Sequence, residues 1–154
     1  QGNTRIFLVP YYLFEMASLK ASNINGYELV LFRRYMVKVA EKIALQNGFK
    51  ALVTGDSLGQ VASQTMDNIA QITNIVSLPI FQPLIAYDKQ EIIDLAKDIS
   101  TYELSIEKYK DCCSIITYNP RTKANSRQID TLEKNMDIEN LIEQTLELVS
   151  VIEV

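Results

Sequence analysis

The sequence predicts an α/β domain, arranged as a three-layer sandwich with a parallel sheet between layers of helices. Three short apolar runs, residues 4–9, 50–54 and 77–81, have the composition of buried strands. Amphipathic helical patterns separate these runs, and such alternation is typical of parallel sheets covered on both faces. Because the chain has 154 residues and is 47% hydrophobic, we expect residues 1–154 to form one domain with a real core.

Composition and charge exclude several classes of protein. The chain has no histidine, so a conventional zinc site and a Cys-His dyad within it are excluded, and we expect no metal site. The formal net charge of −4 argues against a bulk electrostatic grip on nucleic acid. No apolar run approaches the ~20 residues of a membrane helix, and no signal-peptide pattern is present. We therefore expect a cytoplasmic protein without membrane contact.

The first half of the chain predicts a strand and two helices. Residues 4–9 end at Pro10, which cannot continue a ladder, and residues 11–21 suit a short helix. A long helix follows over residues 27–46 and is closed by Asn47-Gly48. Within it, Arg33 borders the apolar stripe, whereas Arg34 falls on the wetter side. Arg33 is thus the candidate for a specific role, the alternative being an arginine whose stem lies along the core edge.

The most informative stretch is residues 51–68, ALVTGDSLGQVASQTMDN, which reads as strand, loop and helix. Its two glycines, Gly55 and Gly59, let the backbone approach a ligand, and the following helix N-terminus presents unpaired N–H groups to an anion or nucleotide. Amide side chains recur on one helical face, including Gln64 and Asn68. Such a face suits recognition of a ligand; the alternative is an ordinary polar face.

A further helix is predicted from Asp88, which forms a D-x-x-E capping box with Glu91. Lys89 then lies in the first helical turn, where the macrodipole disfavours a cation. A residue that opposes its local preference is a candidate for function; the alternative is a solvated lysine. Near the end of the chain, residues 137–149 have apolar side chains at helical spacing.

The only cysteines, Cys112 and Cys113, are adjacent, so they cannot close a stabilising long loop with each other. A nucleophilic thiolate needs positive charge nearby, and the basic residues around Lys108 and Arg121 are a source of it. Asp111 opposes this effect. For either thiol, the alternative is an inert, packed cysteine.

Several motifs, in this order and at these intervals, resemble those of the tRNA 4-thiouridine synthetase family of tRNA uridine sulfurtransferases, which is also linked to thiamine thiazole biosynthesis. They are Arg33-Arg34-Tyr-Met, TGDSLGQVASQT at 54–65, Pro83-Leu84, Asp88-Lys89 and Asp111-Cys112-Cys113. The resemblance covers nearly the whole chain. It implies a PP-loop ATP-pyrophosphatase domain of the adenine nucleotide alpha-hydrolase fold.

The resemblance also implies a reaction. The family adenylates the C4 oxygen of a tRNA uridine with ATP, releases pyrophosphate and then introduces sulfur from a persulfide. By this resemblance Arg33, Gly55 and Gln64 would contact the nucleotide, with Mg as its counterion. Lys89 would assist adenylation and Cys112 would take part in sulfur transfer. A cysteine desulfurase would be the source of the sulfur.

The sequence departs from the family pattern. The SGG-x-DS pyrophosphate loop and the tRNA-binding domains should lie upstream of Thr4, so we expect the C-terminal part of a catalytic domain, lacking the first strand and PP-loop and inactive alone. Gln82 stands where the family usually has arginine, Ser100 where it has glycine, and Asp56 where it often has glutamate. Because the first strand would be missing, one edge of the sheet would be open, and this open edge predicts a homo-oligomer.

Two other hypotheses stay open. The first is that the chain is a non-catalytic nucleotide-binding or assembly module derived from the same domain. A free-standing RNA-binding module is the weakest reading, because of the net charge and the lack of an RNA-binding motif.

The two cysteines should differ in reactivity. Successive residues of an extended loop point in opposite directions, so one thiol faces a cleft while its neighbour packs. We predict that iodoacetamide labels Cys112 well before Cys113, as measured by peptide mass spectrometry over time. Equal, slow labelling of both residues would contradict the role given to Cys112.

Overall fold

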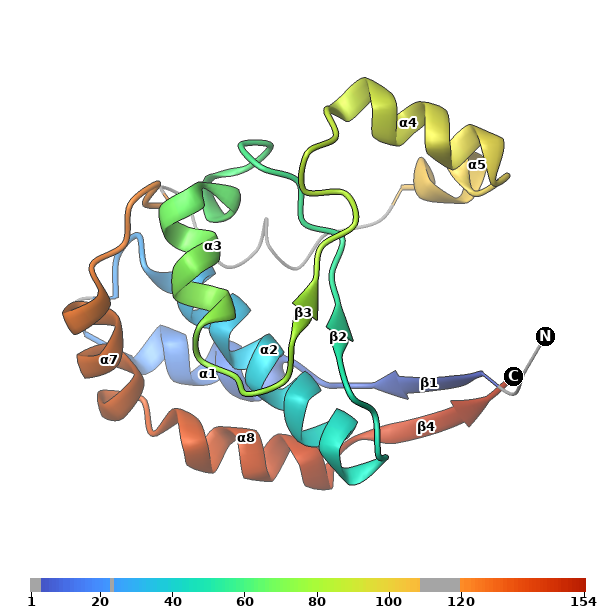
Figure 1. Ribbon diagram of the computed structural model, residues 1–154. Helices are drawn as coiled ribbons and strands as arrows, with labels where there is room; N and C mark the ends of the chain where they lie inside the picture. Colours follow the sequence, from blue (N-terminus) through green and yellow to red (C-terminus); the bar gives the residue numbers. More distant parts are fainter. Residues whose placement is uncertain (1–3, 23, 109–119) are drawn as a thin grey trace.

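The computed structural model describes residues 4–22, 24–108 and 120–154. A helical body carries two pairs of short strands (Figure 1). The elements in chain order are β1 Arg5–Leu8, α1 Tyr12–Lys20, α2 Glu28–Gln46, β2 Leu52–Val53, the 3-10 turn η1 Ala62–Gln64, α3 Met66–Thr73, β3 Ile80–Phe81, α4 Lys89–Asp98, α5 Tyr102–Ser105, α7 Ser126–Asn135, α8 Ile138–Glu147 and β4 Ser150–Glu153. In these described parts, the helices are too short or too polar to cross a membrane.

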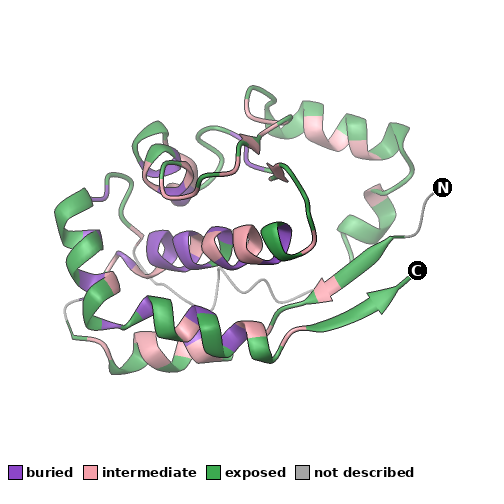
Figure 2. Ribbon diagram, turned by 60° about the horizontal axis from the view of Figure 1, so that its bottom comes forward, coloured by how far each residue is buried: buried purple, intermediate pink, exposed green. Residues whose placement is uncertain are grey.

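Helix α2 is the centre of the core, and α1, α3 and α8 pack against it. Most of its turns are buried, as Figure 2 shows. The rings of Phe14, Phe32 and Tyr35 form tilted or stacked pairs whose centroids are 5.2 to 6.5 Å apart. The buried hydroxyl of Tyr35 forms a hydrogen bond with Thr145 of α8. Burial raises the pKa of Tyr35 and outweighs the opposing effect of that hydrogen bond.

The strands form two separate two-stranded sheets among the described residues. Strands β2 and β3 are parallel, with Leu52 opposite Ile80, as the sequence predicts for this pair. Strand β1 instead pairs antiparallel with β4, so the prediction of residues 4–9 as a buried parallel strand is wrong. Three of the four β1 residues are exposed, and Phe7 packs against the core. The β1–β4 ribbon extends away from the helices, and the C-terminal end of the chain lies at its tip (Figure 1).

Most helices agree with their predictions. Helices α1, α2 and α8 lie within the predicted ranges, and the capping box of Asp88 and Glu91 begins α4. The single helix expected after Gly59 is wrong, because Thr65 is extended and divides it into η1 and α3. The Thr65 hydroxyl then caps α3 by accepting from the backbone of Asn68. Helix α7 has no counterpart in the sequence analysis.

The placement of Arg34 on the wetter side of α2 is wrong as well. Its side chain is only 6% exposed, against 18% for Arg33. Glu133 of α7 receives bidentate hydrogen bonds from Arg34, 2.8 Å from Nε and 2.9 Å from Nη2. Helix α7 covers this side of α2, and the pattern within α2 alone contains no sign of it.

Asn68 is completely buried and joins α3 to the chain beyond the undescribed segment. Its Nδ2 donates to the carbonyl oxygens of Ala62, at 2.8 Å, and Arg121, at 2.9 Å. Its Oδ1 accepts from the backbone N–H of Ala124 at 3.1 Å. The prediction that Asn68 belongs to a ligand-reading amide face is therefore wrong, because every polar atom of this side chain serves the fold.

Replacing Asn68 with alanine should lower the free energy of unfolding by about 1–3 kcal/mol, because it leaves buried backbone groups without partners. The exposed Asn140, which accepts a hydrogen bond from Gln144, provides a matched control. Asn140→Ala should change stability by less than about 0.5 kcal/mol. Urea denaturation of both variants measures the difference, and equal stabilities would contradict the anchoring role of Asn68.

Candidate functional site

The candidate site lies at the carboxyl ends of the parallel strands β2 and β3, where ligands of open α/β sheets gather. Thr54, Gly55 and Asp56 follow β2 directly, and Gln82 follows β3. Arg33 reaches the same place from α2, and η1 supplies Gln64. Residues distant in sequence thus meet because the strands are parallel and α2 packs beside them.

Asp56 is the centre of this cluster and is only 3% exposed. Its Oδ1 accepts from Arg33 Nη2 at 2.5 Å and from Gln64 Nε2 at 3.2 Å. Its Oδ2 accepts from Thr54 Oγ1 at 2.7 Å and from Gln82 Nε2 at 3.0 Å. One carboxylate therefore joins four polar side chains from four parts of the chain.

These contacts determine the charge state of the site. Burial raises the pKa of Asp56, but the hydrogen bond from Thr54, the charge of Arg33 and the hydrogen bond from Gln82 outweigh burial. The pKa of Asp56 therefore lies below its ordinary value, and the carboxylate is ionised at neutral pH. Together with the guanidinium of Arg33 it makes an ion pair of no net charge.

A pocket of about 460 Å³ opens beside the cluster. Its apolar lining residues are Met36, Val37, Ala40, Leu52 and Val53. The other lining residues are Arg33, Thr54, Gly55, Asp56 and Gln64. Apolar side chains together with a few fixed polar groups are the usual lining of a small-molecule site.

The structure thus brings together Arg33, Gly55 and Gln64, the three residues expected to contact a nucleotide. A Cβ atom built on Gly55 would meet no atom within 4 Å, so the space next to its backbone is free for a ligand. Gly59 has a different function, because its φ of +77° requires glycine in the turn before η1.

Lys89 is exposed at the first position of α4, as predicted, and is not among the residues that line the pocket. The chain just before Lys89 is hydrogen-bonded to the loop that follows β2, which we call the site loop. The backbone N–H of Leu58 donates to the carbonyl of Ile85 at 3.0 Å, and Ser57 Oγ donates to the carbonyl of Tyr87 at 2.8 Å. These bonds keep the start of α4 next to the loop that follows β2.

Cys112, the residue expected to take part in sulfur transfer, lies outside the described residues, as does Cys113. The chain that resumes at residue 120 lies against α3. Thr65 Oγ1 donates to the carbonyl of Thr122 at 2.6 Å, next to the contacts that Asn68 makes. The backbone N–H of Arg121 donates to the carbonyl of Gly26 at 2.9 Å.

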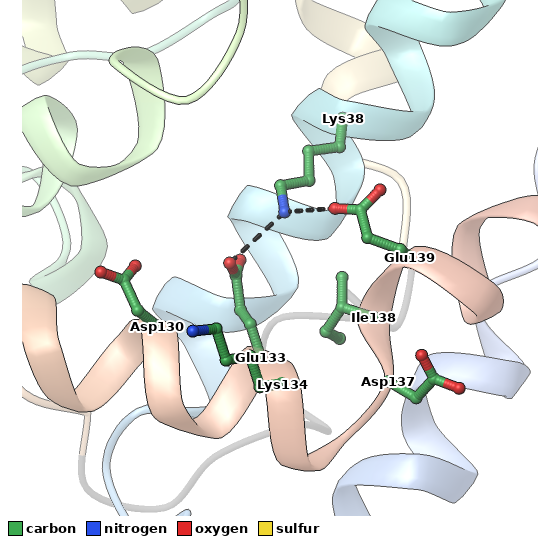
Figure 3. A pocket seen from close by; sticks show the side chains of 7 residues that line it. All are labelled: Lys38, Asp130, Glu133, Lys134, Asp137, Ile138 and Glu139. Carbon is green, nitrogen blue, oxygen red and sulfur yellow. Dashed lines mark hydrogen bonds and ion pairs between the residues drawn. The ribbon is translucent and has the colours of Figure 1, made fainter.

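A second pocket, between α2, α7 and α8, is lined largely by charged side chains (Figure 3). Lys38 lies between two acids there, 3.3 Å from Glu133 Oε2 and 2.8 Å from Glu139 Oε1. Burial raises the pKa of Glu133, but the bonds and charges of Arg34 and Lys38 lower it below its ordinary value. Because Lys38, Glu133 and Glu139 are paired with one another, we interpret this pocket as part of the helix packing.

Sequence reasoning missed Asp56, Thr54 and Gln82 as members of the site. The Thr-Gly-Asp sequence at the end of an apolar strand was an available signal for two of them, because polar residues at strand ends commonly line sites in parallel sheets. Gln82 has the equivalent position after β3.

The stability of the chain should depend on the ionisation of Asp56. Because its folded pKa is depressed, its contribution is complete above the unfolded value of about 3.9 and is lost as pH falls through the folded pKa. At pH 7, Asp56→Asn should cost about 1–3 kcal/mol. The difference in free energy of unfolding between wild type and variant should become smaller below about pH 4.

Urea denaturation across this pH range measures that difference. Asp94→Asn removes an exposed carboxylate that accepts from Gln90, and as a control it should change stability at neutral pH by less than about 0.5 kcal/mol. A difference for Asp56→Asn that stayed constant down to acid pH would contradict the assignment of an ionised carboxylate.

Comparison with known proteins places this geometry in context. The family model described as "Thiamine biosynthesis protein (ThiI)" matches residues 2–138. A probable tRNA sulfurtransferase of Caldanaerobacter subterraneus subsp. tengcongensis is 49% identical over 124 residues, which are 77% of this chain and 33% of that protein. The probable tRNA sulfurtransferase of Brevibacillus brevis is 39% identical over 146 residues, covering 94% of this chain and 36% of that protein.

A solved structure gives the same result. The crystal structure of a 4-thiouridine synthetase in complex with RNA and with bound ATP superposes with a TM-score of 0.91 and is 34% identical. The match covers 99% of this chain and 40% of that one. The chain thus spans roughly a third to two fifths of the length of the relatives it matches. It belongs to the thiamine biosynthesis protein (ThiI) family and corresponds to the C-terminal part of its tRNA sulfurtransferase members.

Proposed function

We propose that the chain is the C-terminal part of the catalytic domain of a tRNA uridine sulfurtransferase, which adenylates a tRNA uridine with ATP and inserts sulfur to form 4-thiouridine. The observation that carries this proposal is the meeting of Arg33, Gly55 and Gln64 in one pocket. These residues come from α2, the end of β2 and η1, and the resemblance of the motifs had implicated all three in nucleotide binding.

The composition of the pocket supports ATP as the ligand. Its apolar lining residues suit the face of a nucleobase, and its polar lining residues offer donors for ring nitrogens or ribose hydroxyls. The related 4-thiouridine synthetase has ATP bound. Mg²⁺ is proposed to accompany the triphosphate as its counterion, since phosphate oxygens are its usual ligands.

Lys89 and Cys112 are proposed to act in the two chemical steps. An exposed lysine at the start of α4, next to the site loop, is suited to stabilise the charge of the departing pyrophosphate. Cys112 would accept or relay the persulfide sulfur, with a cysteine desulfurase as its source. Thiamine thiazole synthesis is proposed as a second use of the same sulfur.

The β2–β3 pair is proposed to belong to a larger parallel sheet of the adenine nucleotide alpha-hydrolase type, with helices on both faces. Val53 and Phe81 are 68% and 60% exposed at these strands, although both are large apolar residues that sheet packing normally covers. Additional strands, the PP-loop and the tRNA-binding domains would come from the further two thirds of the length that the relatives have. A homo-oligomer and a cytoplasmic location complete the proposal.

A chimaera tests this function. The chain would replace the matching segment of the Brevibacillus brevis protein, which aligns with 94% of it, in cells that make no 4-thiouridine of their own. We expect 4-thiouridine in the tRNA of these cells, measured by mass spectrometry of nucleosides. Cys112→Ser should abolish it while pyrophosphate release from ATP continues, because adenylation needs no thiol.

Cys113→Ser is the matched control and should keep the activity of the chimaera. Full thiolation in Cys112→Ser would show that the sulfur-transfer role belongs to another residue. A folded chimaera that binds ATP but makes no 4-thiouridine would favour the alternative, a non-catalytic nucleotide-binding module.

A further inference from the structure

Two of the proposed nucleotide contacts share one acceptor. Arg33 Nη2 and Gln64 Nε2 both donate to Oδ1 of Asp56, although they come from α2 and η1. Both side chains are long and have several rotatable bonds, so without a common partner each would sample many orientations. The shared oxygen holds their polar ends together at the wall of the pocket.

The carboxylate itself is fixed from the opposite side. Its Oδ2 accepts from Thr54 Oγ1 and Gln82 Nε2, which extend from the ends of the two parallel strands. At 3% exposure, Asp56 has little water to compete for these bonds. Asp56 thus links the ends of β2 and β3 to the side chains of Arg33 and Gln64, which belong to α2 and η1.

The ion pair also changes what Arg33 offers to a ligand. One Nη2 hydrogen is taken by Asp56, and the carboxylate neutralises the guanidinium charge at 2.5 Å. The remaining N–H groups of Arg33 are then directional hydrogen-bond donors in a site without excess positive charge. Donors held in place before the ligand arrives reduce the entropy lost on binding.

We propose that Asp56 is a positioning residue that holds Arg33 and Gln64 in the orientation in which they bind the nucleotide. The inference rests on the proposed function, because the ligand is taken to be ATP. Asp56 acts through its two partners, and the loss of its carboxylate should weaken ATP binding even where the fold survives.

The test uses the chimaera with the Brevibacillus brevis protein and ATP, with dissociation constants from isothermal titration calorimetry. Asp56→Asn should raise the dissociation constant about tenfold, the size expected when a buried charged hydrogen-bond acceptor is lost. Asp56→Glu, which restores the carboxylate, should recover most of the affinity. Recovery of affinity by Asp56→Glu would show that the carboxylate itself is needed to position Arg33 and Gln64, and not only a side chain that fills the space.

Gln82→Leu is the second variant, because Gln82 donates to Asp56 but is not among the residues that line the pocket. It should raise the dissociation constant severalfold by loosening Asp56 alone. Glu133→Gln is the matched control, since it disrupts another buried carboxylate–arginine pair of α2 at a different place. It should lower stability but change ATP affinity by less than about twofold, because the sites share no partners.

The outcomes separate the two proposals. Unchanged affinity in both Asp56→Asn and Gln82→Leu, with ATP still bound by the wild type, overturns the positioning role and leaves the proposed function intact. Equal weakening by Glu133→Gln also overturns it, because the effect would then follow stability. A folded chimaera without substitutions that binds no ATP overturns the nucleotide site and this inference with it.

Discussion

Two adjacent arginines of α2 organise the rest of the structure. Arg33 pairs with Asp56 at the ends of the parallel strands, and Arg34 pairs with Glu133 of α7. Successive helical residues point about 100° apart, so one turn of α2 is attached to two different parts of the molecule. Separating either arginine from its partner would lower the stability of the fold, because an unpaired buried charge is strongly destabilising. The candidate site and the helical body are therefore fixed to the same turn.

Local signals in the sequence were sufficient for α1, α2, α4 and α8. The apolar stripe of α2, the turn at Gly48 and the capping box of Asp88 all depend on residues within a few positions of one another. The pairing of β1 with β4 depends on residues more than 140 positions apart. An apolar run such as residues 5–8 has the same composition in a buried parallel strand and in a two-stranded ribbon, so the pattern alone could not separate them.

The same limit explains which site residues were found. Gly55 and Gln64 belong to the long and specific stretch at 54–65, and Arg33 belongs to a shorter motif before it. Asp56 lies in the same stretch, but its central role depends on Arg33, 23 positions before it, and Gln82, 26 positions after it, which only the fold places around it. For Asn68 the sequence predicted a role in ligand binding, whereas the structure shows a buried residue that holds the fold together. Its spacing with Gln64 suggested a common polar face, but Thr65 interrupts the helix and turns Asn68 into the interior.

Gln82 gives the cluster its electrostatic character. An arginine at this position would place a second cation on the Asp56 carboxylate, whereas glutamine donates its hydrogen bond without charge. The cluster then contains one cation and one anion. We infer that it orients a ligand through hydrogen bonds more than it attracts phosphate by charge. If the ligand is ATP, as proposed, positive charge for its phosphates would come from outside this cluster, and Lys89, exposed at the start of α4, is the residue proposed to supply it.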